Sequence, residues 1–157
     1  MYLYFFDLDD TICNTAQAVK HLESKYNLKK EDYADEHEYF QVLDNKLREY
    51  GLDNISILEN STVSLLQQLI KDKAHDNIYY ITARESTVRQ ESVVWLKKYN
   101  LWLGEDRLLM DTQNIKGKTI DGIMSSSDKQ FAFLFDDLID NHKEAASYKK
   151  IISCFPI

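Results

Sequence analysis

Short apolar runs alternate with longer amphipathic stretches along this chain. Runs of mostly apolar residues predict buried strands at 2–6, 78–81, 107–110, 131–135 and 151–155. Between them, apolar side chains at helical spacing predict helices at 88–99, 116–124 and 141–149. Strands that alternate with helices form right-handed βαβ units, which place helices on both faces of a parallel sheet. The pattern therefore predicts an α/β fold.

The connection after the first strand is longer than the others. Roughly sixty residues separate Asp10 from the second strand, whereas a crossover needs only a dozen or so. This segment has helical periodicity, and either Asn60 or Ser61 could cap a helix that follows it. We predict a Rossmann-like parallel sheet with flanking helices and a small helical cap inserted after the first strand. The cap would comprise residues 14–60, and the core domain residues 1–13 and 61–157.

Polar side chains follow three of the predicted strands. In chain order these residues are Asp7, Asp9, Thr82, Asp136 and Asp137. Ligands of open parallel sheets bind at the carboxyl ends of the strands, so these groups are expected at one edge. Any one acidic pair could simply cap a helix, but clustered carboxylates repel one another unless a cation lies among them. Mg²⁺ prefers carboxylate oxygens together with water and substrate phosphate, so the pattern indicates a magnesium site.

The same residues resemble the four motifs of the haloacid dehalogenase-like hydrolase superfamily. Residues 7–11 (Asp-Leu-Asp-Asp-Thr) resemble the first motif, Asp-x-Asp-x-Thr after an apolar strand. Thr82 resembles the second motif, Lys116 the third, and residues 136–137 (Asp-Asp) the fourth. The motifs occur in the family order and cover almost the whole chain. Lys118 is a rival to Lys116 for the third motif.

The resemblance implies a phosphoric monoester hydrolase that works through an aspartyl-phosphate. Asp7 would be the nucleophile, and Asp9 would protonate the leaving oxygen and then deprotonate water. Thr82 and Lys116 would hold the phosphoryl oxygens. An aspartate at the second acidic position of the first motif is typical of phosphatases rather than of dehalogenases.

The resemblance also implies a set of magnesium ligands. Asp7, the main-chain carbonyl of Asp9, and Asp136 would bind Mg²⁺. Asp137 would act through water or orient the lysine. The four histidines show no metal-ligand spacing and are expected at the surface. Arg84 would either contact substrate or form an ordinary ion pair.

The predicted cap indicates a small phosphorylated substrate. Residues 81–84 (Ile-Thr-Ala-Arg) and 95–98 (Trp-Leu-Lys-Lys) resemble nucleotidases of the deoxyribonucleotidase type, so nucleoside monophosphates come first among candidate substrates. Aromatic residues of the cap could stack on a base, although at helical spacing such residues more often form a helical core. They are Tyr26, Tyr33, Tyr39, Phe40 and Tyr50.

Three other functions stay open at this stage. A polynucleotide 3′-phosphatase-like end-processing enzyme has the same core motifs. A non-catalytic binding protein on the same scaffold is the alternative outside the enzymes. Phosphoryl transfer to an acceptor other than water would use the same intermediate.

Composition and charge exclude or disfavour several classes of protein. Apolar residues make up 44% of the 157 residues and charged residues 29%, as in ordinary globular proteins. The net charge of −7 disfavours tight binding to duplex nucleic acid. The apolar run at the N-terminus is too short for a signal peptide or a membrane span, so a cytoplasmic location without membrane association is expected. The sequence indicates no oligomeric state.

Overall fold

The strands form a five-stranded parallel sheet in a computed structural model that describes residues 1–156. They are β1 (Tyr2–Phe6), β2 (Ile78–Ile81), β3 (Leu108–Leu109), β4 (Phe131–Phe135) and β5 (Ile151–Cys154). The order across the sheet is β3-β2-β1-β4-β5, and all neighbours are parallel. The predicted α/β fold with a Rossmann-like sheet is confirmed.

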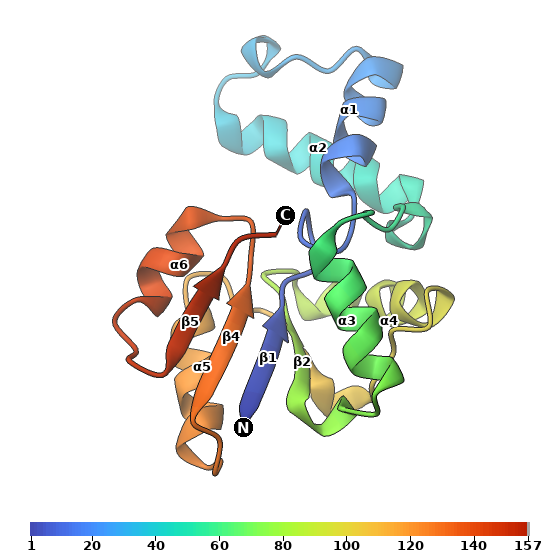
Figure 1. Cartoon of the computed structure of the whole chain (residues 1–157). Helices are drawn as coiled ribbons and strands as arrows, with labels where there is room; N and C mark the ends of the chain where they lie inside the picture. The colour runs from blue at the N-terminus through green and yellow to red at the C-terminus, as the bar shows by residue number, and fades with distance from the viewer. Residues whose placement is uncertain (157) are drawn as a thin grey trace.

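Four of the helices cover the two faces of this sheet, α3 and α4 on one face and α5 and α6 on the other (Figure 1). In chain order the α-helices are α1 (Thr15–Tyr26), α2 (Glu36–Tyr50), α3 (Ser61–Lys71), α4 (Arg89–Lys98), α5 (Lys116–Ser125) and α6 (Ile139–Ala145). Side chains of α3 and α4 share one buried cluster with Phe6, whereas side chains of α5 and α6 share another with Leu3 and Phe5. Neighbouring residues of β1 thus face opposite layers, because side chains alternate along a strand.

Helix α6 begins and ends earlier than the predicted 141–149. The Leu138 N–H donates to the Asp136 side chain at 2.9 Å, and this turn starts the helix at Ile139. At the other end, Tyr148 N–H donates to the Ala145 carbonyl, and Ile151 N–H donates to the Tyr148 carbonyl. These turns end the helix because the chain must reverse direction to enter β5.

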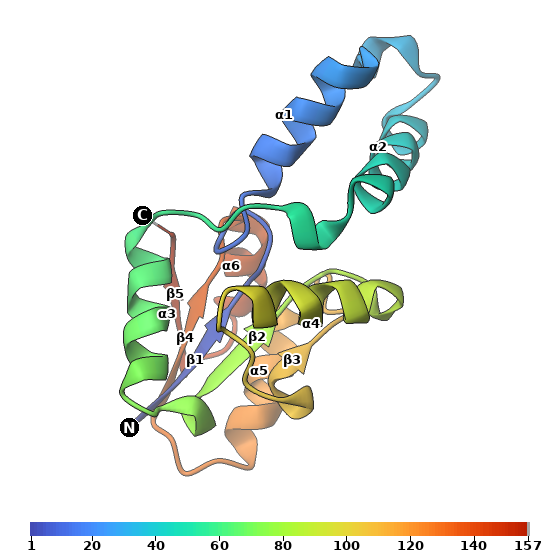
Figure 2. The same ribbon diagram turned by 90° about the vertical axis from the view of Figure 1, so that its right-hand side faces the viewer.

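Helices α1 and α2 form a hairpin that projects beyond the carboxyl ends of the strands (Figure 2). The two segments that join it to the rest of the chain run side by side. Asn14 N–H donates to the Ser56 carbonyl at 2.8 Å, and Leu58 N–H donates to the Ile12 carbonyl at 2.9 Å. The hairpin is therefore attached through this hydrogen-bonded pair of segments, and Trp95 on α4 also donates to the Ile55 carbonyl at 2.7 Å.

Most of the aromatic residues assigned to the cap pack within the hairpin. The Tyr39 ring contacts Tyr33 and Phe40, and its hydroxyl donates to Glu23 on α1. These residues lie near the turn between α1 and α2, which is the end of the hairpin farthest from the sheet (Figure 2). The aromatic cluster therefore serves the packing of α1 against α2.

Asn60, rather than Ser61, caps α3. The Asn60 side-chain oxygen accepts from Val63 N–H at 2.8 Å, which satisfies one of the free donors at the helix start. The Asn60 side-chain amide also donates to the Thr11 carbonyl at 3.2 Å. One side chain thus ties the start of α3 to the loop after β1.

Two glycines of α5 offer a matched test of helix packing. A Cβ at Gly117 would lie 2.7 Å from the Ala145 Cα on α6, whereas a Cβ at Gly122 would meet nothing within 4 Å. We expect Gly117→Ala to lower the free energy of unfolding by about 1–3 kcal/mol through overpacking. Gly122→Ala should raise it by about 0.5–1 kcal/mol, because alanine favours the helix. Urea unfolding of both variants checks this, and equal effects would contradict the close approach of α5 to α6.

No helix among residues 1–156 combines the length and apolar character needed to cross a membrane.

Candidate functional site

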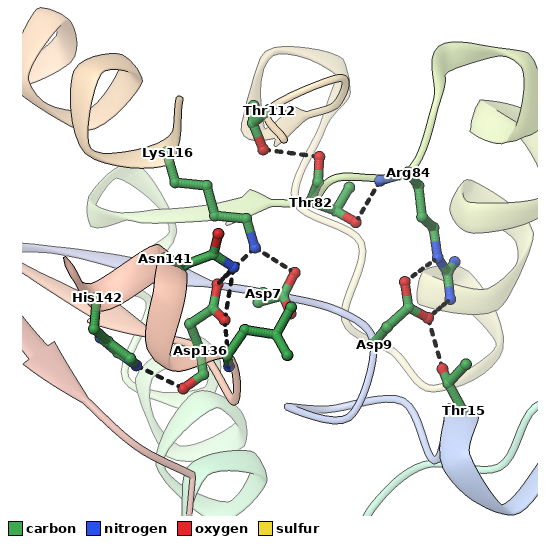
Figure 3. A network of polar contacts seen from close by, with 11 residues as sticks. Asp7, Asp9, Thr15, Thr82, Arg84, Thr112, Lys116, Asp136, Asn141 and His142 are labelled. Atoms are coloured by element: carbon green, nitrogen blue, oxygen red, sulfur yellow. Dashed lines mark hydrogen bonds and ion pairs between the residues drawn. The ribbon is translucent and has the colours of Figure 1, made fainter. Parts of the chain in front are cut away.

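A lysine lies buried between two carboxylates at the carboxyl edge of the sheet (Figure 3). Lys116 Nζ donates to Asp7 Oδ1 at 2.8 Å and to Asp136 Oδ2 at 2.6 Å, and only 1% of Lys116 is exposed. Asp7 follows β1 and Asp136 follows β4, and these strands pair in register with Phe6 opposite Phe135. Parallel pairing therefore brings two residues distant in sequence to the same lysine.

Lys118 lies outside this cluster. It is exposed, and its main-chain N–H donates to Glu144 on α6 at 3.1 Å. Lys116 is the first residue of α5, where the helix start faces the ends of β1 and β4. Of the two rival lysines, the fold thus places Lys116 among the carboxylates.

The first turns of α6 hold Asp136 in place. Asn141 Nδ2 donates to both carboxylate oxygens, at 3.0 and 2.9 Å, and His142 Nε2 contacts the main-chain carbonyl of Asp136 at 2.8 Å. Because a carbonyl only accepts, that nitrogen carries the proton. The prediction that His142 lies at the surface is wrong: the residue is buried and packs against Phe155. No motif in the sequence indicated that Asn141 and His142 would contact Asp136.

The cluster carries more negative charge than Lys116 offsets. Burial, reinforced by Asp136 and Asp9, raises the pKa of Asp7 to about 8, although Lys116 opposes the shift. Burial disfavours the charge on Lys116, but Asp7 and Asp136 together raise its pKa. Burial and the neighbouring Asp136 raise the pKa of Asp137 to about 6. A cation would relieve this repulsion.

Three carboxylates of the cluster fit a hard divalent cation. One oxygen from each of Asp7, Asp136 and Asp137 lies within 4.8 Å of the others. An all-oxygen set with few carboxylates is what Mg²⁺ takes in proteins, with water or substrate completing its shell. Asp137 thus lies within reach as a ligand, whereas the contact with Lys116 comes from Asp136. The residues present therefore fit the ion that the sequence predicts.

Thr82 lies buried at the end of β2. Its hydroxyl oxygen accepts from Arg84 N–H at 3.1 Å, which leaves the hydroxyl proton for another acceptor. Thr112, a buried residue that sequence patterns did not indicate, donates its hydroxyl to the Thr82 carbonyl at 2.8 Å. The turn after β2 is thereby fixed beside the turn after β3.

The Asp9 carboxylate points toward Arg84, on the side of Asp7 opposite to Lys116 (Figure 3). It pairs with Arg84, whose Nε and Nη2 donate to its two oxygens at 2.9 and 2.7 Å, and it accepts from the Thr15 hydroxyl at 2.6 Å. Burial would raise the pKa of Asp9, but the Arg84 guanidinium outweighs it and lowers that pKa. Arg84 was expected either to contact substrate or to form an ion pair, and the structure shows an ion pair with Asp9.

A cavity of about 290 Å³ borders Asp9. Its walls come from the hairpin and from the loop after β2, in the following residues: Asp9, Thr15, Asp44, Leu47, Arg48, Leu52, Ala83, Arg84, Glu85 and Val88. Arg48 on α2 contacts Asp44 at 3.0 Å and lies 3.8 Å from Glu85. The cavity thus lies between the hairpin and the loop after β2.

The buried acids make the stability of the metal-free protein depend on pH. Because the pKa of Asp7 is raised from 3.8 to about 8, the folded state keeps a proton that the unfolded chain releases. The free energy of unfolding should therefore fall as pH rises from about 4 to about 8. Urea unfolding with a chelator present measures this. Asp7→Asn should flatten the curve, and a wild-type curve that rises relative to Asp7→Asn would contradict the buried-acid assignment.

Comparisons with known proteins support the fold. No family model matches the chain, and no curated protein matches it. Among solved structures, it resembles a protein from Burkholderia xenovorans LB400 described as a haloacid dehalogenase-like hydrolase. The TM-score is 0.57 at 15% identity, over 98% of this chain and 81% of that one. The chain therefore has the fold of a haloacid dehalogenase-like hydrolase.

Proposed function

We propose that this protein is a magnesium-dependent phosphomonoester hydrolase that forms an aspartyl-phosphate on Asp7. The observation that carries the proposal is the buried cluster in which Lys116 joins Asp7 to Asp136, with Asp137 within reach of the same cation. A buried lysine held by two carboxylates is costly for stability alone, so a site that uses both charges is the better explanation.

Each residue of the cluster has a distinct role in this proposal. Asp7 attacks phosphorus with the oxygen that does not contact Lys116. Lys116 and the free hydroxyl proton of Thr82 bind the phosphoryl oxygens as negative charge develops on them. Mg²⁺, held by Asp7, Asp136, Asp137 and the Asp9 carbonyl, would supply further neutralisation of the phosphoryl charge.

Asp9 serves the leaving-group side of the site. It borders the cavity that lies between α2 and the loop after β2, so the group released from phosphorus would occupy that cavity. We propose that residues 14–60 act as a cap over the core formed by 1–13 and 61–157. The hydrogen-bonded pair of segments at Asn14 and Ser56 would be its hinge.

Nucleoside monophosphates head the substrates to be tested, because of the sequence resemblance. The cavity beside Asp9 has no aromatic residue in its lining, so a base would find no stacking partner there. Small sugar and polyol phosphates therefore belong in the same panel. A 3′-phosphorylated oligonucleotide tests the end-processing alternative, and a panel with alcohols as competing acceptors tests phosphoryl transfer.

Removal of magnesium provides the direct test. We expect hydrolysis of nitrophenyl phosphate by the Mg²⁺-loaded protein, loss of that activity in EDTA, and recovery when Mg²⁺ is added in excess. Release of inorganic phosphate is the measurement. Activity that persists in EDTA would contradict the metal dependence. Magnesium binding without turnover of any phosphoester in the panel would instead favour the non-catalytic binding protein.

A further inference from the structure

The Asp9 carboxylate is held from two sides by residues that the proposed chemistry does not use directly. Arg84 contacts both oxygens through Nε and Nη2, and Thr15, the first residue of α1, donates to Oδ1. The Arg84 side chain is only 7% exposed, compared with 34% for that of Asp9. A planar guanidinium that binds both oxygens fixes orientation in a way that a single donor cannot.

Arg84 is itself anchored. Its Nη1 donates to the Ser92 hydroxyl at 3.0 Å, and that hydroxyl donates to the Val88 carbonyl at 3.0 Å. Ser92 lies buried on α4. The orientation of Asp9 is therefore set by the rigid packing of α4 and not by a mobile surface side chain.

These contacts leave one hydrogen-bond acceptor position of the Asp9 carboxylate free. An ionised carboxylate offers about four acceptor positions. Two positions on Oδ1 accept from Arg84 and Thr15, and one on Oδ2 accepts from Arg84. The fourth position, on Oδ2, stays available on a side chain that borders the cavity. The carboxylate is thus arranged as a proton acceptor with a fixed direction.

We infer that Arg84 is a positioning residue that aims Asp9 at the water that hydrolyses the intermediate. The inference rests on the proposed function. In that step the water oxygen attacks phosphorus, the bond from phosphorus to Asp7 breaks, and its electron pair returns to the Asp7 carboxylate. One water proton passes to Asp9 Oδ2 and later to solvent, and inorganic phosphate leaves. The first step on an aryl phosphate releases a stable anion and needs no proton from Asp9.

Rapid mixing with nitrophenyl phosphate separates the two steps in the Mg²⁺-loaded protein. The burst of nitrophenol reports formation of the aspartyl-phosphate, and the steady-state rate reports its hydrolysis. In Arg84→Gln the burst rate should change by less than about threefold, while the steady-state rate falls about 10²-fold, as for loss of an aligned base. Arg84→Lys should behave like Arg84→Gln, because an ammonium binds as a point charge.

Two further variants complete the design. Arg89→Gln is the matched control, because Arg89 binds Glu105 and the Leu108 carbonyl and does not contact Asp9. It should keep the wild-type burst and turnover. Ser92→Ala removes the anchor of Arg84 with little change in shape. It should slow the steady-state rate several-fold with an unchanged burst, and it carries the test if the Arg84 variants do not fold.

The outcomes distinguish this inference from the proposed function. A wild-type protein that turns over no phosphoester overturns the proposed function, and the inference with it. An active wild type whose folded Arg84 variants lose both rates by one factor, or lose neither, overturns the inference alone. Wild-type turnover in Arg84→Lys would also overturn the inference, because a positive charge beside Asp9 would then be enough without the planar guanidinium that orients it. If only Ser92→Ala folds, an unchanged steady-state rate in that variant overturns it equally.

Discussion

Asp7→Asn should reduce turnover of nitrophenyl phosphate on the order of 10⁴-fold or more, as expected when a nucleophile is lost. The amide keeps the shape of the side chain and its place beside Lys116, but it cannot form the aspartyl-phosphate. The measurement is steady-state phosphate release at saturating Mg²⁺, together with a search for covalent phosphoenzyme by mass spectrometry.

Asp10→Asn is the matched control for that experiment. Asp10 lies in the same loop, and its side chain accepts from Ala16 N–H at 2.7 Å at the start of α1. Asparagine keeps this contact, so activity should stay within about threefold of wild type. If Asp7→Asn turned over substrate as fast as wild type, Asp7 would not be the nucleophile.

Lys116→Met should have the second largest effect. It leaves Asp7 and Asp136 buried without their shared cation, so without magnesium the free energy of unfolding should fall by about 3 kcal/mol. Loss of a donor to the phosphoryl oxygens should lower kcat by about 10²–10³-fold. Urea unfolding in EDTA and in Mg²⁺ tests the first effect, and the metal should restore part of the lost stability.

Lys118→Met is the control for both effects of Lys116→Met, on stability and on turnover. Lys118 is exposed and its side chain lies outside the cluster, so both stability and turnover should stay near wild type. A larger loss of turnover in Lys118→Met than in Lys116→Met would assign the phosphate-binding role to Lys118. It would also contradict the arrangement on which the proposed function rests.

The sequence by itself determined most of the sheet. The apolar runs at β1, β2 and β4 were predicted at the residues where these strands lie, since strands buried on both faces need apolar side chains throughout. The polar residues after them identified the edge that carries Asp7, Thr82 and Asp136. Strand ends could be placed because the pattern breaks there, whereas α6 was displaced because a side-chain turn starts it at Ile139.

Only the tertiary structure decided which groups support and orient the site. The sequence favoured Lys116 but left Lys118 as a rival, and the structure places only Lys116, at the start of α5, against both carboxylates. The partner of Asp9 is Arg84, 75 residues away, and this contact requires β1 and β2 to lie side by side. His142 carries no spacing signal, yet the turn after β4 buries it against Asp136. Local patterns report burial and periodicity, whereas pairing between distant residues depends on the topology of the sheet.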